Sequence, residues 1–505
     1  MVESLSLTLI PAFSIIEILT LLVFKARFFN YILLSLSGSA VIIFALFSSS
    51  PIFFTVFLFF SIYRIVNLFR GTKQYSKKLK NSIINSSIRL NIVLLVLLLL
   101  QYDNLFVYFF NLKSLFIYNL AIVLILLAIN IISHFNILSS KHIHKPIHYY
   151  DRDLPTVSVL IPARNETDDL ESCLSSLIKS DYPKLEVIVL DDCSLSKKTS
   201  QIIKNYAHNG VRFLQGQIPD DDWLPKNYAY EQLADQANGD ILLFCGVDVR
   251  FESHTIRSMI DIFKTESYSM ISVMPKNTYK NKADGGSLFY QPLRYAFEVS
   301  FPRYYIVRPP VLSTCWLIEK NVLQKYGSFK SVKHKVSPES FFSRQVLLSK
   351  KKYKLLRSDE TIGLQSNKSP IEQKQTAIRT YYPKLHRRLD LVSIVTLAEF
   401  MLFIFPTISL IIGIIKLNNP ILISSLVAII LEVIYYDQLI NLTFDKRIIR
   451  YRFLVLLAFL LDIYLYNLSM YLYEFRKVYW KERNICLPVL NYDFKLPSLN
   501  QEQKY

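Results

Sequence analysis

Basic and acidic side chains follow one strand-like run after another in the middle of this 505-residue chain. Arg164 and Glu166 come after TVSVLIP, Asp191 and Asp192 end LEVIVLDD, and Asp248 ends GDILLFCGVD. In a sheet of parallel strands, ligands bind beyond the carboxyl ends of the strands, so we expect these side chains to line one crevice. The carboxylates would make the crevice negative, which is unfavourable unless a cation or hydrogen-bond donors bind there. A Mg²⁺ or Mn²⁺ ion that carries the diphosphate of a nucleotide fits this chemistry.

The elements that position these side chains can be read from the alternation of apolar runs and helical patterns. Each acidic residue taken singly, such as Glu166 or Asp191, could instead end a strand or cap a helix. The ordered series favours βαβ units, which pack as a mostly parallel sheet with helices on both faces. The expected strands are Thr156 to Pro162, Leu185 to Ser194, Val211 to Gly216 and Gly239 to Asp248, and the expected helices are Thr167 to Ser180, Lys197 to Ala207 and Lys226 to Asn238.

Two groups of long apolar segments flank this region. A helix that crosses a bilayer core of about 30 Å needs roughly 20 mostly apolar residues, and buried helices of a soluble protein do not fit segments this long and this poor in charge. We expect about five transmembrane helices in residues 1–140, a soluble domain in 150–388, two or three helices in 389–475 and a cytoplasmic tail in 476–505. The expected spans are Leu7 to Phe24, Phe28 to Phe47, Ile52 to Phe69, Leu90 to Phe110, Leu115 to Ile137, Leu391 to Ile415, Ile421 to Ile440 and Phe453 to Tyr473.

The positive charge of the chain lies beside these spans. Lys and Arg outnumber Asp and Glu by 58 to 40, but the location of the excess argues against nucleic acid as a partner. Cytoplasmic loops carry the positive excess, so we expect a multi-pass protein of the cell membrane whose soluble domain faces the cytoplasm. The residues concerned are Lys25, Arg27, Arg70, Lys73, Lys77, Lys78, Lys80, Arg89, Lys141 and Lys145.

Four segments resemble the successive motifs of the family 2 glycosyltransferases. They are VSVLIPARNE, EVIVLDDCS, WLPKNYA and GDILLFCGVDVRF, and the resemblance covers about Pro155 to Lys354. It implies an α/β GT-A domain, Rossmann-like with a mostly parallel sheet, inserted between the two groups of helices. It further implies that Arg164, Glu166, Asp191 and Asp192 surround the base and ribose of a nucleotide-sugar donor, that Lys226 approaches its diphosphate, and that Asp248 holds the metal.

The chain departs from the family pattern near the expected metal. The usual Asp-x-Asp at the end of the fourth strand has Gly246 in its first position, so only the second carboxylate, Asp248, remains. In the family that second Asp is generally the metal ligand, and metal binding therefore stays part of the expectation. Pro225 replaces the usual Gly before Lys226.

The expected catalytic base also differs from the family pattern. The Glu-Asp pair of the family, whose Asp is the general base, reads Pro338-Glu339 in HKVSPESFFSRQV. Glu339 can do the same chemistry, since a base needs a carboxylate within hydrogen-bond reach of the acceptor hydroxyl and a suitable pKa. The alternative is a surface acid at a helix start. With Glu339 as base, the acceptor oxygen would displace the diphosphate in one step that inverts the anomeric carbon, while Lys226 and the metal neutralise the leaving group.

The segment after the resemblance concerns the acceptor. Processive members of the family carry a Gln-x-x-Arg-Trp motif, which is absent between Leu355 and Leu391. Ala377 to Leu389 takes its place and is typical of a basic-aromatic helix on lipid headgroups. We therefore favour single transfer over polymer synthesis. The large number of expected spans suggests that the acceptor is a lipid-linked or polyprenyl-linked molecule of the membrane.

The tail contains VYWKERNI, which resembles the Trp-Lys-Gly-Arg element after the last span of several membrane-bound members. This places Trp480 and Arg483 in the cytoplasm. Three spans after a cytoplasmic domain would leave the tail outside. Either Leu391 to Ile415 is interfacial or re-entrant, or Phe453 to Tyr473 does not cross, and we favour the first.

Two other functions remain open. The missing first Asp and the altered Glu-Asp pair suggest a catalytically inactive subunit or scaffold, and a processive polysaccharide synthase is the second. A transporter would need polar or broken spans along a path, and the N-terminal spans are too uniformly apolar for that. The five cysteines have neither paired nor metal-ligand spacing, so no disulfide framework is expected.

Overall fold

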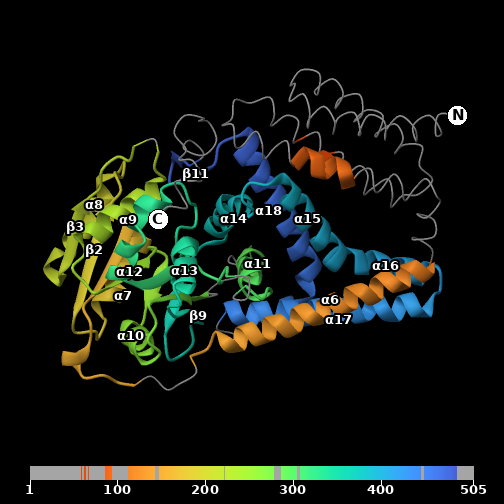
Figure 1. The fold of residues 1–505 in the computed structure, drawn as a ribbon, viewed down its shortest axis with the longest axis horizontal. Coiled ribbons are helices and arrows are strands. Elements are labelled where there is room, and N and C mark those ends of the chain that lie inside the picture. The colour runs from red at the N-terminus through yellow and green to blue at the C-terminus, as the bar shows by residue number, and fades with distance from the viewer. Residues whose placement is uncertain are drawn as a thin grey trace.

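The computed structural model describes residues 59, 62, 63, 66, 86–93, 112–142, 147–220, 222–277, 286–303, 307–444 and 449–485. Within these ranges an α/β domain lies at one end of the molecule and a group of long helices at the other (Figure 1). The expected spans Leu7 to Phe24 and Phe28 to Phe47 lie outside the described residues, as do most residues of the next two expected spans.

A seven-stranded sheet forms the centre of the α/β domain, with the order β3-β2-β1-β4-β8-β6-β9. The first four strands of this order pair in parallel, β8 is antiparallel to β4 and β6, and β9 is parallel to β6. The mostly parallel sheet is therefore confirmed. The strands are β1 (Val157–Ala163), β2 (Leu185–Asp191), β3 (Val211–Gln215), β4 (Ile241–Cys245), β6 (Met270–Met274), β8 (Cys315–Glu319) and β9 (Tyr353–Arg357).

Helices cover both faces of this sheet. Neighbouring residues of a strand point to opposite faces, so Val159 packs in the cluster of α7, α8 and α10, whereas Leu160 packs in that of α9, α12 and α13. Every strand and helix expected between residues 156 and 248 is present, within three residues of its expected limits. The helices are α7 (Asp168–Ile178), α8 (Lys197–Asn205), α9 (Pro225–Gln236), α10 (Thr255–Thr265), α12 (Lys320–Lys325) and α13 (Glu339–Leu348), with short 3₁₀ turns at Asp151–Asp153, Ala207–Asn209 and Ser328–Val332.

Four of the five cysteines lie in the described part of the chain. Cys173, Cys193, Cys245 and Cys315 are free thiols, and three of them are buried in the sheet and in α7. Cys486 lies outside the described residues.

A second, three-stranded sheet continues from the end of β4. Its order is β5-β10-β7, with β5 (Val249–Phe251), β10 (Leu364–Ser366) and β7 (Lys276–Asn277). The pair between Ser366 and Val249 brings the residues after β10 beside Asp248. Segments more than a hundred residues apart in sequence thus meet at the expected crevice.

Two helices join the α/β domain to the apolar helices. They are α11 (Ser287–Val299) and α14 (Pro370–Lys384), which pack on each other and on α18, while α11 also packs on α17. A capping box starts α14, because the Ser369 side chain accepts from the backbone N–H of Glu372 and the Glu372 carboxylate accepts from the backbone N–H of Ser369. These helices place the crevice at the junction with the apolar helices.

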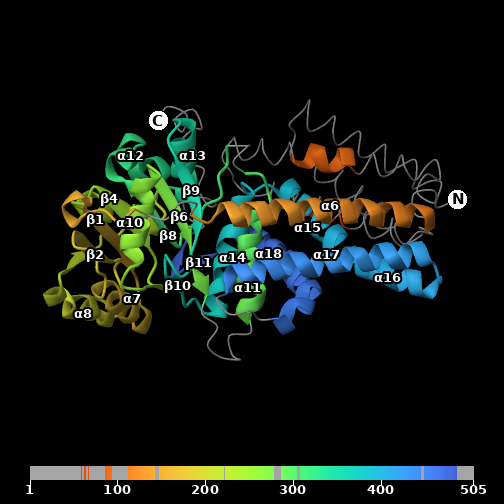
Figure 2. The ribbon, with the colours of Figure 1, turned by 90° about the horizontal axis from the view of Figure 1, so that it is seen from below.

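Four helices in the described part of the chain are long and apolar enough to cross a membrane: Leu115–Ser139, Leu389–Ile415, Asn419–Thr443 and Arg452–Phe475. They agree with the expected spans that fall on described residues. Figure 2 shows α6, α16 and α17 side by side. The elements are α6 (Leu112–Ser139), α15 (Leu389–Glu399), a π-helical turn (Phe400–Ile404), α16 (Phe405–Ile415), α17 (Asn419–Thr443), a 3₁₀ turn (Ile449–Leu454), α18 (Val455–Phe475) and the hairpin strands β11 (Tyr479–Trp480) and β12 (Arg483–Asn484).

Both ends of α18 lie next to the α/β domain. Before its first turn, Arg452 pairs with Asp437 of α17 at 2.7 Å. One turn further along α17, the carbonyl oxygen of Asn441 accepts a hydrogen bond from Lys276 of β7 at 2.7 Å. At the other end of α18, the hairpin β11–β12 reaches the strand ends of the large sheet.

This position of α18 bears on the uneven number of expected spans. If α15 and α16 lead away from the α/β domain and α17 returns to it, then α18 begins and ends on the side of the domain. Of the two alternatives, this arrangement favours the one in which Phe453 to Tyr473 does not cross the membrane. It argues against an interfacial or re-entrant Leu391 to Ile415. Pro406, which could break the segment Leu391 to Ile415, lies in a continuous helix with one π-helical turn.

Candidate active site

Arg164, Asp191 and Asp192 meet at the carboxyl ends of β1 and β2, and all three are buried. Arg164 Nη1 donates a hydrogen bond to the carbonyl oxygen of Asp192 at 2.7 Å. The Asp191 carboxylate accepts from the backbone N–H of Ser194 at 3.0 Å and so fixes the turn after β2. Burial raises the pKa of Asp192 from 3.8 to about 6, although Arg483 and Arg164 act in the opposite direction.

The C-terminal hairpin covers these strand ends. Arg483 Nη1 donates to Oδ1 of Asp192 at 2.7 Å. Lys481 Nζ forms an ion pair with Glu166 at 2.8 Å, and Arg164 Nε donates to the carbonyl oxygen of Lys481 at 2.9 Å. The tail element therefore contacts three of the four residues expected around the base and ribose.

Asp248 lies after β4, beside two residues that follow β10. Ser366 Oγ donates to Asp248 Oδ2 at 3.2 Å, and Lys368 Nζ lies 4.0 Å from the same oxygen. Burial raises the pKa of Asp248, but Lys368, a backbone N–H and Arg294 outweigh it and hold the pKa below its ordinary value. The carboxylate is thus kept ionised by cations around it.

Gly246 marks the missing first carboxylate of the family's Asp-x-Asp. A Cβ atom at this position would lie 2.5 Å from Oδ1 of Asp248. Such a contact forces the carboxylate of Asp248 to move. With Asp248 where it is, this turn therefore has no room for a side chain at position 246.

Glu339 is the first residue of α13 and only 3% exposed, which argues against a surface acid. Its electrostatic neighbours are Lys226, Lys384 and Arg294. Burial raises the pKa of Glu339 in spite of these cations. A carboxylate with a raised pKa accepts a proton more readily, which is what a general base needs.

Lys226, in the first turn of α9, lies in the same crevice. It is an electrostatic neighbour of both Glu339 and Asp248, and its ammonium group lies 5.2 Å from the ring centroid of Tyr230. Burial lowers the pKa of Lys226, with the positive charge of Arg379 acting in the same direction. The structure thus brings Lys226, Asp248 and Glu339 together at one end of the crevice.

Three cations that the sequence analysis did not assign to the donor site complete this end of the crevice. Arg294 lies in α11, Lys368 follows β10, and Arg379 lies in α14. All three are electrostatic neighbours of Asp248. The expectation of a negatively lined crevice is therefore wrong. The reason is topological, because α11 and α14 lie far from the strand ends in sequence and bring their cations to the carboxylates.

The two ends of the crevice are connected through Glu372. Glu372 is an electrostatic neighbour of Glu166 at the hairpin and of Lys368 and Arg379 beside Asp248. Of the predicted tail residues, Arg483 binds a donor-site acid, whereas Trp480 is half-buried and packs against the cluster of α14 and α18. Asp191 accepts a hydrogen bond within its own turn and is an electrostatic neighbour of Asp192.

The basic-aromatic segment Ala377 to Leu389 was expected on lipid headgroups, and its tyrosines lie elsewhere. Tyr381 and Tyr382 are buried, and their hydroxyls donate to Asp462 at 2.7 Å and to Glu474 at 2.8 Å. Both acceptors belong to α18. The segment thus packs against α18 because its phenol groups satisfy buried carboxylates there.

A divalent ion was expected at Asp248. Within the described ranges, no group of three or more His, Cys, Asp or Glu side chains is arranged to hold a metal ion. Mg²⁺ is often bound by one or two carboxylates together with phosphates of the substrate. Asp248 therefore suits a divalent ion only when a diphosphate supplies further ligands, and Lys368 would share the carboxylate with that ion.

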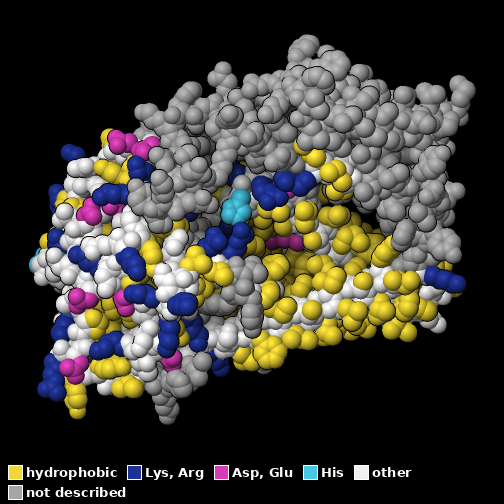
Figure 3. Space-filling view, viewed as in Figure 1, with side chains coloured by type: hydrophobic (Ala, Val, Ile, Leu, Met, Phe, Trp, Pro, Cys, Tyr) yellow, Lys and Arg dark blue, Asp and Glu magenta, His cyan; other side chains and the backbone are white. Residues whose placement is uncertain are grey.

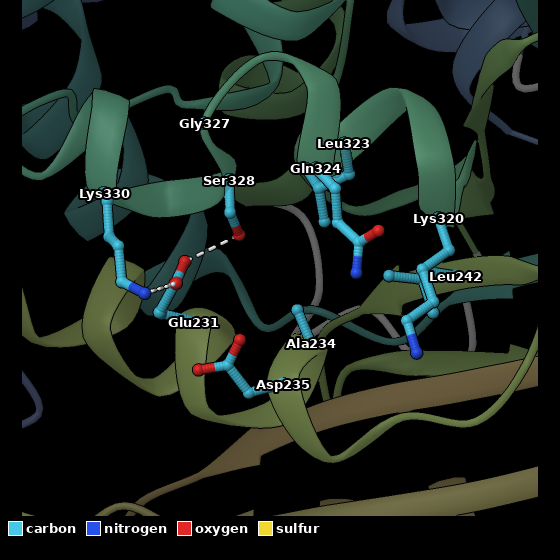
Figure 4. A pocket seen from close by; sticks show the side chains of 10 residues that line it. All are labelled: Glu231, Ala234, Asp235, Leu242, Lys320, Leu323, Gln324, Gly327, Ser328 and Lys330. Carbon is cyan, nitrogen blue, oxygen red and sulfur yellow. Dashed lines mark hydrogen bonds and ion pairs between the residues drawn. The ribbon is translucent and has the colours of Figure 1, made fainter.

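A separate pocket lies behind the sheet, between α9 and the turn after α12 (Figure 4). Its Glu231 accepts hydrogen bonds from Ser328 Oγ at 2.6 Å and pairs with Lys330 at 3.2 Å. None of the predicted site residues lines it. The crevice at the strand ends, and not this pocket, holds the expected chemistry.

This sheet, with a polar crevice beyond its carboxyl ends and the Asp248 turn after β4, belongs to the GT-A class of α/β domains. Residues 158–327 match the family model described as Glycosyl transferase family 2. This part of the chain is therefore similar to the family 2 glycosyltransferases, as the motifs indicated. Glu339 and Lys368 lie beyond the matched residues.

Curated relatives share part of this domain. The 4,4′-diaponeurosporenoate glycosyltransferase of Staphylococcus haemolyticus is 30% identical over 131 residues, which are 24% of this chain and 32% of the relative. The poly(ribitol-phosphate) β-N-acetylglucosaminyltransferase TarS of Staphylococcus aureus is 32% identical over 105 residues, 20% of this chain and 17% of the relative. The similarity thus spans a third or less of the length of each relative.

Solved structures with a related shape are more distant. The mannosyltransferase PcManGT from Pyrobaculum calidifontis, in complex with GDP-Man and Mn²⁺, is 12% identical with a TM-score of 0.39, covering 69% of this chain and 99% of that one. Residues 1–349 of S. aureus TarS in complex with UDP are 18% identical with a TM-score of 0.31, covering 65% of this chain and 95% of that one.

Proposed function

We propose that the protein is a membrane-bound, inverting glycosyltransferase that moves a sugar from a nucleotide-sugar donor to a lipid-linked acceptor. The observation that carries the proposal is Glu339, a buried carboxylate with a raised pKa beside Lys226 in the crevice of a family 2 domain. A surface acid or a helix cap would not need this burial. The donor class follows from the family 2 domain, and the sugar and nucleotide are not specified by any residue.

In the proposed donor site the nucleotide lies over the ends of β1 and β2. Asp192 and Glu166 would accept hydrogen bonds from the base and ribose, while Arg164 fixes the turn that carries Asp192. Asp191 would act through the same turn. The diphosphate would extend towards Lys226 and Asp248. A Mg²⁺ or Mn²⁺ ion bound by Asp248 and the diphosphate would supply positive charge to the leaving group.

The proposed reaction is one in-line displacement. Glu339 takes the proton of the acceptor hydroxyl, and the acceptor oxygen forms a bond to the anomeric carbon from the face opposite the diphosphate. The bond between that carbon and the diphosphate oxygen breaks, and its electron pair leaves with the nucleoside diphosphate. Lys226 stabilises the charge that develops there, in a buried site where electrostatic effects are strong.

The acceptor is proposed to reach Glu339 from the membrane side. Lys384 of α14 and Arg294 of α11 are neighbours of Glu339, and these two helices pack on the apolar helices α17 and α18. A lipid whose head group lies at the membrane surface could therefore present its hydroxyl to the base. The absence of a Gln-x-x-Arg-Trp motif supports single transfer over processive synthesis.

Basic residues support a cytoplasmic orientation of the α/β domain. Lys and Arg side chains gather where this domain meets the apolar helices (Figure 3). Positively charged residues are enriched on the cytoplasmic side of membrane proteins. Burial lowers the pKa of His386, which follows α14, and its electrostatic neighbours Arg308, Lys335, Arg344 and Arg388 act in the same direction.

The experiment that tests this function is sugar transfer by the full-length protein in native membranes. Radiolabelled nucleotide-sugars are supplied singly with Mg²⁺ or Mn²⁺, and lipid extracts are analysed for label. Turnover that is lost in Glu339→Gln supports the proposal. Binding of a nucleotide-sugar without any turnover would replace it with the inactive subunit, and a labelled polymer would replace it with the processive synthase.

A further inference from the structure

Arg294 is a buried arginine whose charge is not paired. Its side chain is 7% exposed, and within the described ranges it forms no hydrogen bond or ion pair. Arg294 lies at the end of the crevice that holds Asp248 and Glu339. The charged groups described there interact with it electrostatically but form no hydrogen bond or ion pair with it. A buried charge without a partner is strongly unfavourable, so a site that keeps one is built to receive a ligand of opposite charge.

The surroundings of Arg294 carry an excess of positive charge. Lys226, Arg294, Lys368 and Arg379 surround Asp248 and Glu339. The remaining acid nearby, Glu372, is engaged in its capping box, where it accepts from the backbone and side chain of Ser369 at 3.1 and 2.9 Å. Even with Glu372 counted, four cations face three carboxylates.

The space beside Asp248 is unfavourable for a metal ion that has no further ligands. Lys368 Nζ lies 4.0 Å from Oδ2 of Asp248, the carboxylate expected to bind a divalent ion. Arg294 and Arg379 are further electrostatic neighbours of Lys368, so positive charges crowd this position. An anion relieves this crowding, whereas a cation increases it.

We propose that Arg294 and Lys368 form a diphosphate-binding site that holds the donor's leaving group by protein cations, so that donor binding does not depend on a divalent metal. This inference rests on the proposed function and deepens it, because it names the groups that neutralise the leaving group. Guanidinium and ammonium groups bind phosphate oxygens through charge-assisted hydrogen bonds. Arg294 supplies several donors in a fixed plane, and Lys368 brings its positive charge to 4.0 Å from the carboxylate of Asp248. Lys226 and Arg379 border the same space.

The test is calorimetric titration of the full-length protein in nanodiscs with UDP and with GDP, in EDTA and in Mg²⁺. At least one of the two should bind in EDTA. Arg294→Gln and Lys368→Gln should each weaken that binding by about ten- to a hundredfold, the range for loss of a hydrogen bond to a charged group. Lys330→Gln, an exposed lysine in the pocket behind the sheet, should leave it unchanged.

Nucleosides separate phosphate binding from a structural effect. Uridine and guanosine lack the diphosphate, so their affinity should be the same in Arg294→Gln, Lys368→Gln and the parent chain. Equal weakening of nucleoside and nucleotide would overturn the assignment, and so would binding that occurs only with Mg²⁺. If no nucleotide and no nucleoside binds, with or without metal, the proposed function is overturned as well.

Discussion

Arg483 and Asp192 lie 291 residues apart in sequence and form two hydrogen bonds. Arg483 Nη1 donates to Asp192 Oδ1 at 2.7 Å, and Nη2 donates to the Asp192 carbonyl oxygen at 3.1 Å. The other carboxylate oxygen, Oδ2, is buried and has no hydrogen-bond partner among the described residues. The tail thus holds one oxygen of a donor-site acid and leaves the second to a ligand, which makes the hairpin a wall of the proposed nucleotide pocket.

Protonation of Asp192 should weaken nucleotide binding. Because burial raises its pKa to about 6, the carboxyl becomes neutral below that pH and loses an acceptor. We expect the affinity for UDP or GDP to fall as the pH drops through about 6, by up to about tenfold per pH unit. The folded pKa lies above the ordinary 3.8, so the contribution of Asp192 to stability is full below 3.8 and is lost as the pH rises through 6. Protonation of Asp192 therefore does not destabilise the fold, and a loss of stability through this residue cannot explain weaker binding in acid.

The same titration tests the role of the tail. Arg483 lowers the pKa of Asp192, so Arg483→Gln should move the midpoint of the binding curve to higher pH. Lys477→Gln changes an exposed residue of the same tail and should not move it. A midpoint that is identical in Arg483→Gln and in the parent chain would contradict the role given to the hairpin.

Glu339→Gln should abolish transfer and retain donor binding. Removal of a general base lowers the rate by about 10²- to 10⁴-fold. Glu339→Asp keeps a carboxylate on a shorter side chain and should be intermediate. Turnover is measured with the labelled nucleotide-sugar that the parent chain uses, and binding of its nucleoside diphosphate is measured by calorimetry. Full activity of Glu339→Gln would remove Glu339 from the reaction.

Gly246→Asp should not create a better metal site, although it restores the family's Asp-x-Asp. A Cβ atom would lie 2.5 Å from the Asp248 carboxylate, and this carboxylate must then leave its position beside Lys368. Only the end of a short side chain has to move, so we expect destabilisation of about 1 kcal/mol, an ordinary value for point mutants. Transfer should fall at every Mg²⁺ concentration, and Gly246→Ala should show a smaller loss. Higher activity in Gly246→Asp would refute the steric argument.

The βαβ part of the fold was predictable because its signals are local. The run Val157–Ala163 is apolar at nearly every position and is buried at every position, and β2 and β4 have similar apolar runs. The carboxylates at the strand ends follow from the same pattern, since parallel strands end at one edge. Asp192 and Asp248 were found in this way.

The cations of the site were not predictable from local patterns. Arg294 is the one basic residue of the amphipathic helix α11, and nothing in the sequence beside it distinguishes it from a surface arginine. Lys368 reaches Asp248 only because β10 pairs with β5, a contact between segments more than a hundred residues apart. Long-range pairing of this kind depends on tertiary packing, and so the sign of the crevice could not be predicted from the strand ends alone.

Glu298 should be important for stability at the junction of the two parts. It is 2% exposed and accepts hydrogen bonds from Lys384 Nζ at 3.1 Å and from the backbone N–H of Val311 at 3.1 Å, and it pairs with Arg303. Removing one partner of a buried ion pair typically destabilises a protein by about 3 to 5 kcal/mol. Glu298→Ala should therefore lower the melting temperature in detergent, with Glu252→Ala, a more exposed acid of the same domain, as control.

The pH dependence of this effect has a defined sign. Burial raises the pKa of Glu298, but Arg303 and Lys384 outweigh it and hold the pKa below 4.5. The stabilisation is therefore present above the ordinary pKa and is lost as the pH falls through the folded pKa. The difference in melting temperature between Glu298→Ala and the parent chain should shrink in acid, and a difference that grows would contradict this assignment.

Accessibility of single cysteines should show that α18 begins and ends on the same side of the membrane. Leu417, between α16 and α17, is 84% exposed, while Arg452 precedes α18 and Lys477 follows it. In intact cells a membrane-impermeant maleimide should label Leu417→Cys and leave Arg452→Cys and Lys477→Cys unlabelled until the membrane is permeabilised. Labelling of Arg452→Cys from outside, with Lys477→Cys protected, would mean that α18 crosses. The helix Leu389–Ile415 would then have to be the segment that does not, because Arg483 and Asp192 must remain on one side.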